Sequence, residues 1–215
     1  MQKYADYIKQ IEIDSLWSGT KHILWNLDRR VNILSGAEMI NKIDLTLVTE
    51  LDWQLFQLQR KYLDYQVNIG NRIIAVLQSG DPDAAAKAQK LSEPKRMFQD
   101  IVDSLFKDTG KTIVRTANEI RFDQIGEQLM PYQLSAGEKQ ILAILLTVLV
   151  EDNQPYVLFM DEPEISLHFE WQKQLIGLVL QLNPNIQIIM TTHSPAVVMD
   201  GWTDKVTEVN DITIK

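Results

Sequence analysis

The stretch Val157-Leu-Phe-Met-Asp161-Glu162-Pro163 decides the fold of this chain. A continuous apolar run is typical of a strand that is buried on both faces of a parallel sheet. Two carboxylates follow where the strand ends, and open α/β sheets bind ligands at the carboxyl ends of their strands. An acid at this place can hold magnesium, and a second acid can polarise a water for attack on a phosphate. The same two acids would also suit the N-terminus of a following helix.

Helix and strand alternate on both sides of this stretch. Apolar spacing predicts helices over 136–150 and 164–182, and buried strands over 156–160 and 186–190. This order indicates right-handed crossovers in an α/β sheet. Two edge strands are predicted further on, at 206–209 and 212–214.

The N-terminal half combines short strands with long helices. A small antiparallel start to the sheet is predicted from strands at 8–13, 22–25 and 31–34, and a hairpin from strands at 112–115 and 119–122. Amphipathic spacing predicts helices over 44–79 and 94–107, with Asp83 as a candidate N-cap between them. We therefore expect a head formed by 1–43 and 108–215, with a helical lobe, 44–107, inserted in it.

A histidine follows the predicted strand 186–190, in the segment Thr191-Thr192-His193-Ser194-Pro195. If this strand and 156–160 are neighbours, His193 and Glu162 project from the same edge of the sheet. A lone histidine is more often structural than catalytic. For a histidine at a strand end near two acids, the structural and the catalytic interpretation are about equally strong.

A further motif, Leu134-Ser135-Ala-Gly137-Glu138-Lys-Gln140, precedes the apolar helix at 136–150. The S-x-x-E spacing of Ser135 and Glu138 is that of a capping box, which explains the serine structurally. The same geometry suits phosphate binding at a helix N-terminus. Gly137 would let a polyphosphate approach the backbone closely.

Composition restricts the class of protein. The chain has 215 residues, of which 45% are hydrophobic, so it can bury a sizeable core. Its net charge of −8 disfavours a DNA-coating module. The absence of cysteine excludes a disulfide framework, a thiolate zinc site and a cysteine nucleophile. The longest apolar run, 141–150, is too short to span a bilayer, so we expect no membrane span and a cytoplasmic protein.

Taken together, these motifs resemble the ATPase heads of the ATP-binding-cassette superfamily over residues 130–200. The segment 134–140 is similar to the signature motif, and 157–163 to the Walker B strand with its glutamate. The segment Glu164-Ile-Ser-Leu-His168 falls at the D-loop, and 192–195 at the switch-histidine loop. The form Asp-Glu-Pro-Glu-x-Ser-Leu-His resembles the soluble branch, which includes SMC-like, RecF-like and OLD-type AAA ATPases.

The resemblance implies a P-loop NTPase-like head, with a mixed sheet and ATP and Mg²⁺ as cofactors. Asp161 would bind the magnesium ion, Glu162 would activate water, and His193 would sense the γ-phosphate. Ser135 and Gly137, with Glu138 in the same motif, would clamp ATP that is held by a second subunit. The subunits would form a homodimer or a pair of ATPase heads. Related heads drive a partner in DNA repair or anti-phage defence, beside DNA or an effector such as a nuclease.

The phosphate-binding loop departs from the family pattern G-x-x-x-x-G-K-[ST]. Gly36 and Lys42 keep their spacing, but Asn41 replaces the second glycine and Ile43 replaces the magnesium-binding hydroxyl. Two interpretations fit: a degraded loop, or a chain that jumps from Gly36 to a later segment and lacks a strand–loop–helix unit. We favour the jump because the other ATP-site motifs, Glu162 included, are intact.

The sequence thus leaves two functions from different classes. The first is an ATP-hydrolysing head, provided that the full-length protein has a working phosphate loop. The second is a catalytically silent regulatory or scaffold subunit that cannot bind ATP itself and offers its signature motif to a partner ATPase. The nucleotide-binding subunit of a membrane transporter fits less well, because His168 stands where transporters usually carry aspartate.

Overall fold

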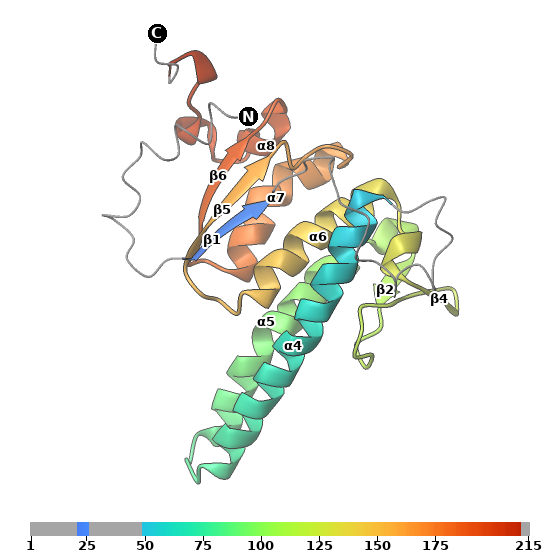
Figure 1. Cartoon of the computed structure of the whole chain (residues 1–215), viewed down its shortest axis with the longest axis vertical. Helices are drawn as coiled ribbons and strands as arrows, with labels where there is room; N and C mark the ends of the chain where they lie inside the picture. The colour runs from blue at the N-terminus through green and yellow to red at the C-terminus, as the bar shows by residue number, and fades with distance from the viewer. Residues whose placement is uncertain (1–20, 26–48, 212–215) are drawn as a thin grey trace.

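A parallel three-stranded sheet lies at the centre of the fold (Figure 1). The computed structural model describes residues 21–25 and 49–211. The sheet has the order β1-β5-β6, with β1 at Lys21–Trp25, β5 at Tyr156–Asp161 and β6 at Gln187–Thr191. Both pairings are parallel. The predicted α/β class, and the prediction that the two C-terminal strands are neighbours, are confirmed.

The two C-terminal strands differ in burial. Every residue of β5 from Tyr156 to Met160 is buried or half-buried, as predicted, because β5 lies between two strands. The prediction of full burial is wrong for β6, whose residues alternate between exposed and half-buried. The reason is position: β6 lies at the edge of the sheet in the described part of the chain. The predicted strands 8–13 and 31–34 lie outside the described residues.

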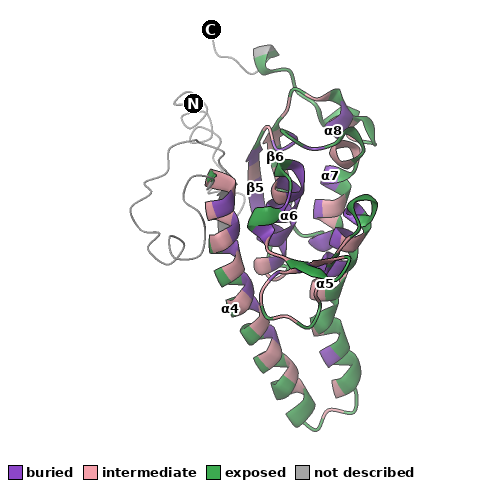
Figure 2. Cartoon of the chain, turned by 90° about the vertical axis from the view of Figure 1, so that its right-hand side faces the viewer, coloured by how far each residue is buried: buried purple, intermediate pink, exposed green. Residues whose placement is uncertain are grey.

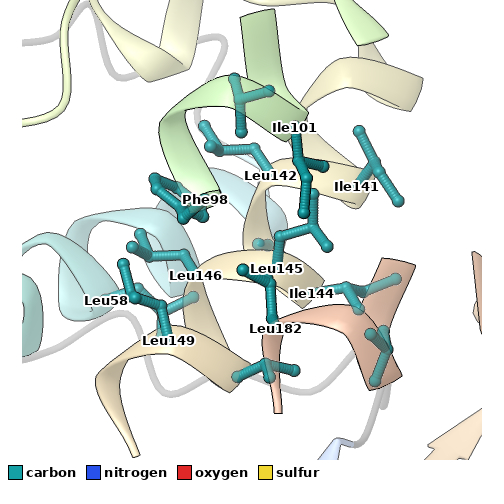
Figure 3. Packing of buried hydrophobic residues seen from close by; sticks show 14 of the residues in the cluster. Leu58, Phe98, Ile101, Ile141, Leu142, Ile144, Leu145, Leu146, Leu149 and Leu182 are labelled. Atoms are coloured by element: carbon teal, nitrogen blue, oxygen red, sulfur yellow. The ribbon is translucent and has the colours of Figure 1, made fainter. Parts of the chain in front are cut away.

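Helix α6 (Ala136–Val150) forms the middle of the hydrophobic core (Figure 3). It is apolar on all sides, so it must be covered on all sides. It is covered by the strand β5 and by three helices: α4 (Glu50–Gln78), α5 (Ala84–Leu105) and α7 (Phe169–Leu182). Residues from all five elements meet in one cluster around Leu142, Leu145 and Leu146, which have essentially no exposed surface.

A helical hairpin packs against α6 and projects away from the sheet (Figures 1 and 2). It consists of α4 (Glu50–Gln78) and α5 (Ala84–Leu105). Thr49 begins α4 with a capping box to Asp52. Along α4, one face is buried over its first two-thirds, and the far end of the hairpin is exposed (Figure 2).

Helix α5 begins at Ala84, well before the predicted start at residue 94, and Pro94 lies inside it. A proline removes one backbone hydrogen bond from a helix. Buried Ala88 and Phe98 on either side hold the helix in place, so tertiary packing overrides the local signal. Asp83 precedes the helix but makes no side-chain cap. The division into a head and an inserted lobe stays a prediction.

A second, antiparallel sheet follows the hairpin and contains β2 (Lys111–Ile113), β3 (Phe122–Gln124) and β4 (Glu127–Leu129). The predicted hairpin corresponds to the pair β2–β3. The sequence pattern missed β4, because the turn before it places Ile125 and Gly126 at positive φ of 54° and 84°. Such turns favour Asn-Gly or Asp-Gly, and isoleucine hides the signal.

The described C-terminal residues contain short helical turns and irregular backbone, and no strand. After α8 (Pro195–Met199), short 3-10 turns cover Thr203–Lys205 and Val209–Asp211. The predicted strand 206–209 is therefore wrong; its valines are exposed and lack a neighbouring strand among the described residues. The predicted strand 212–214 lies outside the described residues. None of the helices in the described ranges is long and apolar enough to cross a membrane.

Candidate functional site

The acids after β5 and the histidine after β6 meet at the carboxyl edge of the sheet. The parallel register places Asp161 opposite Thr191. The backbone N–H of Glu162 donates to the carbonyl oxygen of Thr191 at 3.0 Å. His193 Nε2 then lies 3.2 Å from Glu162 Oε1, with the histidine 89% exposed and the glutamate 38% exposed. The structure thus brings together the two side chains that were predicted as catalytic.

Asp161 is exposed at the end of β5 and accepts a hydrogen bond from the Thr191 hydroxyl. A carboxylate is the kind of hard oxygen ligand that Mg²⁺ prefers. The described part of the chain contains no group of three or more metal-ligating side chains. Mg²⁺ ordinarily takes only one or two protein carboxylates, and waters and substrate phosphates complete its ligands. The residues present are therefore compatible with a magnesium ion that arrives with a nucleotide.

Ser135 and Glu138 form the predicted capping box at the N-terminus of α6. Glu138 N–H donates to Ser135 Oγ at 3.3 Å, and Ser135 N–H donates to Glu138 Oε2 at 2.9 Å. Glu138 is 1% exposed, and its Oε1 also accepts from Thr109 Oγ1 at 2.9 Å and Lys111 Nζ at 2.8 Å. Burial by itself raises the pKa of Glu138. The hydrogen bonds from Lys111, Ser135 and Thr109 together lower the pKa by more than burial raises it, so the net shift is downward. The side chain of Glu138 therefore holds the turn together.

Gly137 lies against the loop that follows β5 in the same chain. A Cβ on Gly137 would lie 2.5 Å from the backbone oxygen of Ser166, a distance that real Cβ atoms do not adopt. Gln140, one turn along α6, donates from Nε2 to the carbonyl oxygen of Pro163 at 3.4 Å. The signature-like turn is thus joined to the segment that carries the acids. Sequence spacing does not reveal this contact.

Glu164 is a site residue that was not singled out from the sequence. It is 7% exposed, and its Oε1 accepts three hydrogen bonds from the loop after β6. The donors are Thr192 Oγ1 at 2.6 Å, His193 N–H at 3.1 Å and Ser194 N–H at 3.3 Å. The signal available in the sequence was the position of Glu164, two residues after Glu162 and separated from it by Pro163.

The predicted site residues therefore fall into two groups. Asp161, Glu162 and His193 lie together at the sheet edge, and Ser135, Gly137 and Glu138 gather at the start of α6. The loop 162–167 connects the groups through the contacts of Gly137 and Gln140. Gly36 and the rest of the predicted phosphate loop lie outside the described residues. The roles of all these residues stay predictions.

A parallel sheet with two acids and a histidine at its carboxyl edge, beside a capped apolar helix, defines a P-loop NTPase-like ATPase head. The chain belongs to the family described as "AAA domain, putative AbiEii toxin, Type IV TA system", whose profile matches residues 41–200. The match begins after Gly36 and therefore does not include the start of the predicted phosphate loop.

Named relatives include two retron proteins. The chain is 35% identical over 94 residues to the "Retron Ec83 probable ATPase" of Escherichia coli, covering 39% of this chain and 17% of that protein. It is 28% identical over 98 residues to the "Retron Vc95 probable ATPase" of Vibrio cholerae, covering 40% and 19%. The matched region spans less than a fifth of either relative. A solved Smc head bound to the C-winged helix domain of ScpA has 18% identity and a TM-score of 0.40, covering 57% of this chain and 41% of that one.

Proposed function

We propose that this chain is the head of an ATP-binding-cassette-type AAA ATPase that binds and hydrolyses Mg²⁺-ATP. The observation that carries the proposal is the 3.2 Å approach of His193 Nε2 to Glu162 Oε1, beside Asp161 at the sheet edge. Membership of the AAA family and the similarity to retron ATPases support the same class of protein.

The side chains at the sheet edge suit phosphoryl transfer to water. Asp161 would hold Mg²⁺, which supplies positive charge for the transferred phosphoryl group. Glu162 has a half-exposed carboxylate, which can hold a water by hydrogen bonding and take its proton at an Oε atom. His193 is more exposed than Glu162, and its imidazole can donate a hydrogen bond to a phosphate oxygen.

The N-terminus of α6 would act on a nucleotide held by another head. Ser135 and Gly137 lie where the helix dipole and free backbone N–H groups favour an anion. Glu138 is buried under this turn, so its contribution would be to hold Ser135 in place. A homodimer, or a pair with another ATPase head, would then enclose ATP between the two subunits.

Closing and opening of such a pair would drive a partner in the cytoplasm. The family description names a toxin–antitoxin system, and two relatives are named for retrons. We therefore propose anti-phage defence ahead of DNA repair as the process, with an effector nuclease or DNA as the partner.

A catalytically silent subunit is the second candidate function. It is favoured by the stretch from Gly36 to Ile43, where Asn41 and Ile43 replace the glycine and hydroxyl of a phosphate loop. Such a subunit would not bind ATP alone and would offer Ser135 and Gly137 to a partner head. Intact-mass measurement of the protein from its natural source tests the jump. A mass larger than that of the 215-residue chain supports an omitted segment. A mass equal to it rules that out and leaves two explanations, a deletion or a degraded loop.

The deciding experiment measures Mg²⁺-ATP binding and hydrolysis, first with this chain alone and then with a candidate partner ATPase. Glu162→Gln is expected to abolish turnover and retain an ATP-bound dimer, whereas Glu170→Gln, at an exposed acid on α7, is the matched control. Unchanged hydrolysis in Glu162→Gln would falsify the assignment of the base. If the isolated chain does not bind Mg²⁺-ATP but stimulates hydrolysis by the partner ATPase, the silent subunit is favoured.

A further inference from the structure

Glu164 connects the loop that carries Glu162 to the loop that carries His193. Its Oε1 accepts the backbone N–H groups of His193 and Ser194, and the hydroxyl of Thr192. Carboxylates that accept backbone N–H groups form stronger hydrogen bonds than neutral acceptors do. One buried oxygen therefore holds three consecutive residues around the histidine.

The loop after β6 has a second attachment, which leaves it little freedom. Ser194 Oγ donates to Gln172 Oε1 at 2.6 Å, and Gln172 Nε2 donates to the carbonyl oxygen of Leu167 at 2.9 Å. Gln172 lies on α7, so this attachment comes from a rigid helix. Glu164 supplies the other attachment from the loop after β5. Each of the two anchors contacts Ser194, and Glu164 alone of the two contacts the backbone of His193.

The loop that contains Glu164 has an unusual backbone. Glu162 and Ser166 have positive φ values of 45° and 71°, in the left-handed region that side chains rarely adopt. Surrounding contacts must compensate for such a conformation. The contact of Gly137 with Ser166 holds one end of the loop, and the hydrogen bonds of Glu164 hold its middle. The position of Glu162 therefore depends on the same contacts as the position of His193.

We propose that Glu164 is a positioning residue that holds the His193 imidazole against the Glu162 carboxylate. The positioning of His193 is a property of the chain without nucleotide. Only the effect of this positioning on catalysis rests on the proposed function. Burial of the carboxylate is costly, and its Oε2 has no hydrogen-bond partner among the described residues. The three donors on Oε1 are what offset that cost.

The test is a double-mutant cycle read by NMR in the absence of nucleotide. The chain contains three histidines, so the His193 ring signals can be assigned by substitution. Glu162→Gln is expected to shift the His193 ring signals in the otherwise unchanged chain. In the Glu164→Ala background that shift is expected to disappear, and the amide protons of His193 and Ser194 are expected to lose their protection from exchange.

Equal effects of Glu162→Gln in both backgrounds would overturn the proposal, because His193 would then keep its place without Glu164. Glu164→Gln keeps an acceptor oxygen and is expected to retain most of the coupling. If the alanine variant does not fold, Glu164→Leu replaces it, because leucine fills similar space without an acceptor oxygen. Glu170→Ala, an exposed acid on α7, is the control and is expected to leave the coupling unchanged.

A second arm uses ATP turnover and separates this inference from the proposed function. If Glu164 acts through His193, Glu164→Ala lowers kcat with little change in KM, and adds no further loss in the His193→Ala background. An additional loss in that background would overturn a role through His193. Absence of turnover in the unaltered chain would contradict the proposed hydrolysis, while the NMR arm would still decide the positioning.

Discussion

The backbone oxygen of Ser166 occupies the space beside Gly137, where a Cβ would come within 2.5 Å of it. The glycine of the signature-like turn is therefore needed by the fold of its own chain, whatever it does for a nucleotide. Because the oxygen belongs to the backbone of a loop with a positive φ at Ser166, it cannot move aside as a flexible side chain would. The contact couples the start of α6 to the loop that carries Glu162.

Gly137→Ala is expected to destabilise the protein by about 1–3 kcal/mol, the usual range for overpacking a well-packed site. Urea unfolding monitored by circular dichroism measures the change. Gly177→Ala is the matched control: Gly177 also lies in a helix, but nothing lies within 4 Å of an added Cβ. That variant is expected to gain about 0.5–1 kcal/mol. A Gly137→Ala protein as stable as the original would contradict the close packing.

Lys111→Met should cost about 3 kcal/mol of stability, because it leaves the buried Glu138 carboxylate without its cation. The Lys111 side chain is 12% exposed and lies 2.8 Å from Glu138 Oε1. Lys205→Met removes an exposed ion pair with Asp204 and should leave the stability nearly unchanged, because solvent screens exposed charges. Thermal unfolding of the two variants, side by side, makes the comparison; similar losses would argue against a structural role for the Lys111 pair.

The downward pKa shift of Glu138 predicts a dependence of stability on pH. Burial opposes the shift, but the hydrogen bonds from Lys111, Ser135 and Thr109 prevail and hold the pKa below its ordinary value of 4.5. In acid the unfolded chain therefore binds this proton more readily than the folded chain does. The stabilisation is present above the ordinary pKa and is lost as the pH falls through the lower folded value.

We expect the stability difference between the original chain and Glu138→Gln to shrink as the pH is lowered from about 7 to about 3. Urea midpoints of both proteins, measured across this range, give the difference in stability. Subtracting one from the other at each pH removes the contribution of the other acids, which is the same in both proteins. A difference that does not change with pH would show that Glu138 titrates alike in the folded and unfolded chains.

Ile125→Asn is expected to stabilise the β3–β4 turn by about 1 kcal/mol, because asparagine tolerates the left-handed conformation better than a β-branched residue does. Ile125 has a φ of 54° and is 96% exposed, so little packing is lost. Val206→Asn, at an exposed position with a φ of −81°, is the control and should have little effect. Thermal melting of both variants tests this. Equal changes in the melting temperature would contradict the idea that backbone strain at Ile125 destabilises the turn.

Much of the candidate site could be predicted from local sequence. An apolar strand followed by Asp161 and Glu162, and a second strand followed by His193, are patterns that depend on neighbours in the chain. The parallel pairing of β5 and β6 then places these residues at one edge, as predicted. The capping box of Ser135 and Glu138 is likewise local, since its two hydrogen bonds span three residues.

Other features could not be predicted in this way, because contacts between distant segments decide them. Pro94 reads as a helix break, but Phe98 is fully buried in the core and α5 runs through the proline. The alternating exposure of β6 depends on its place at the edge of the described sheet, which its own apolar residues do not reveal. The turn at Ile125 has only Gly126 as a sequence signal, because isoleucine stands where such turns favour asparagine or aspartate.

Local sequence was enough to predict the parts of the candidate site: an apolar strand ending in two acids, a capped apolar helix, and a histidine after the next strand. The tertiary structure alone decided how these parts hold one another, through Gly137 against Ser166 and Glu164 on the loop of His193. The physical reason is range. Capping and periodicity act within a few residues, whereas these contacts join residues 29 apart in the chain and form only once the sheet and α6 have packed.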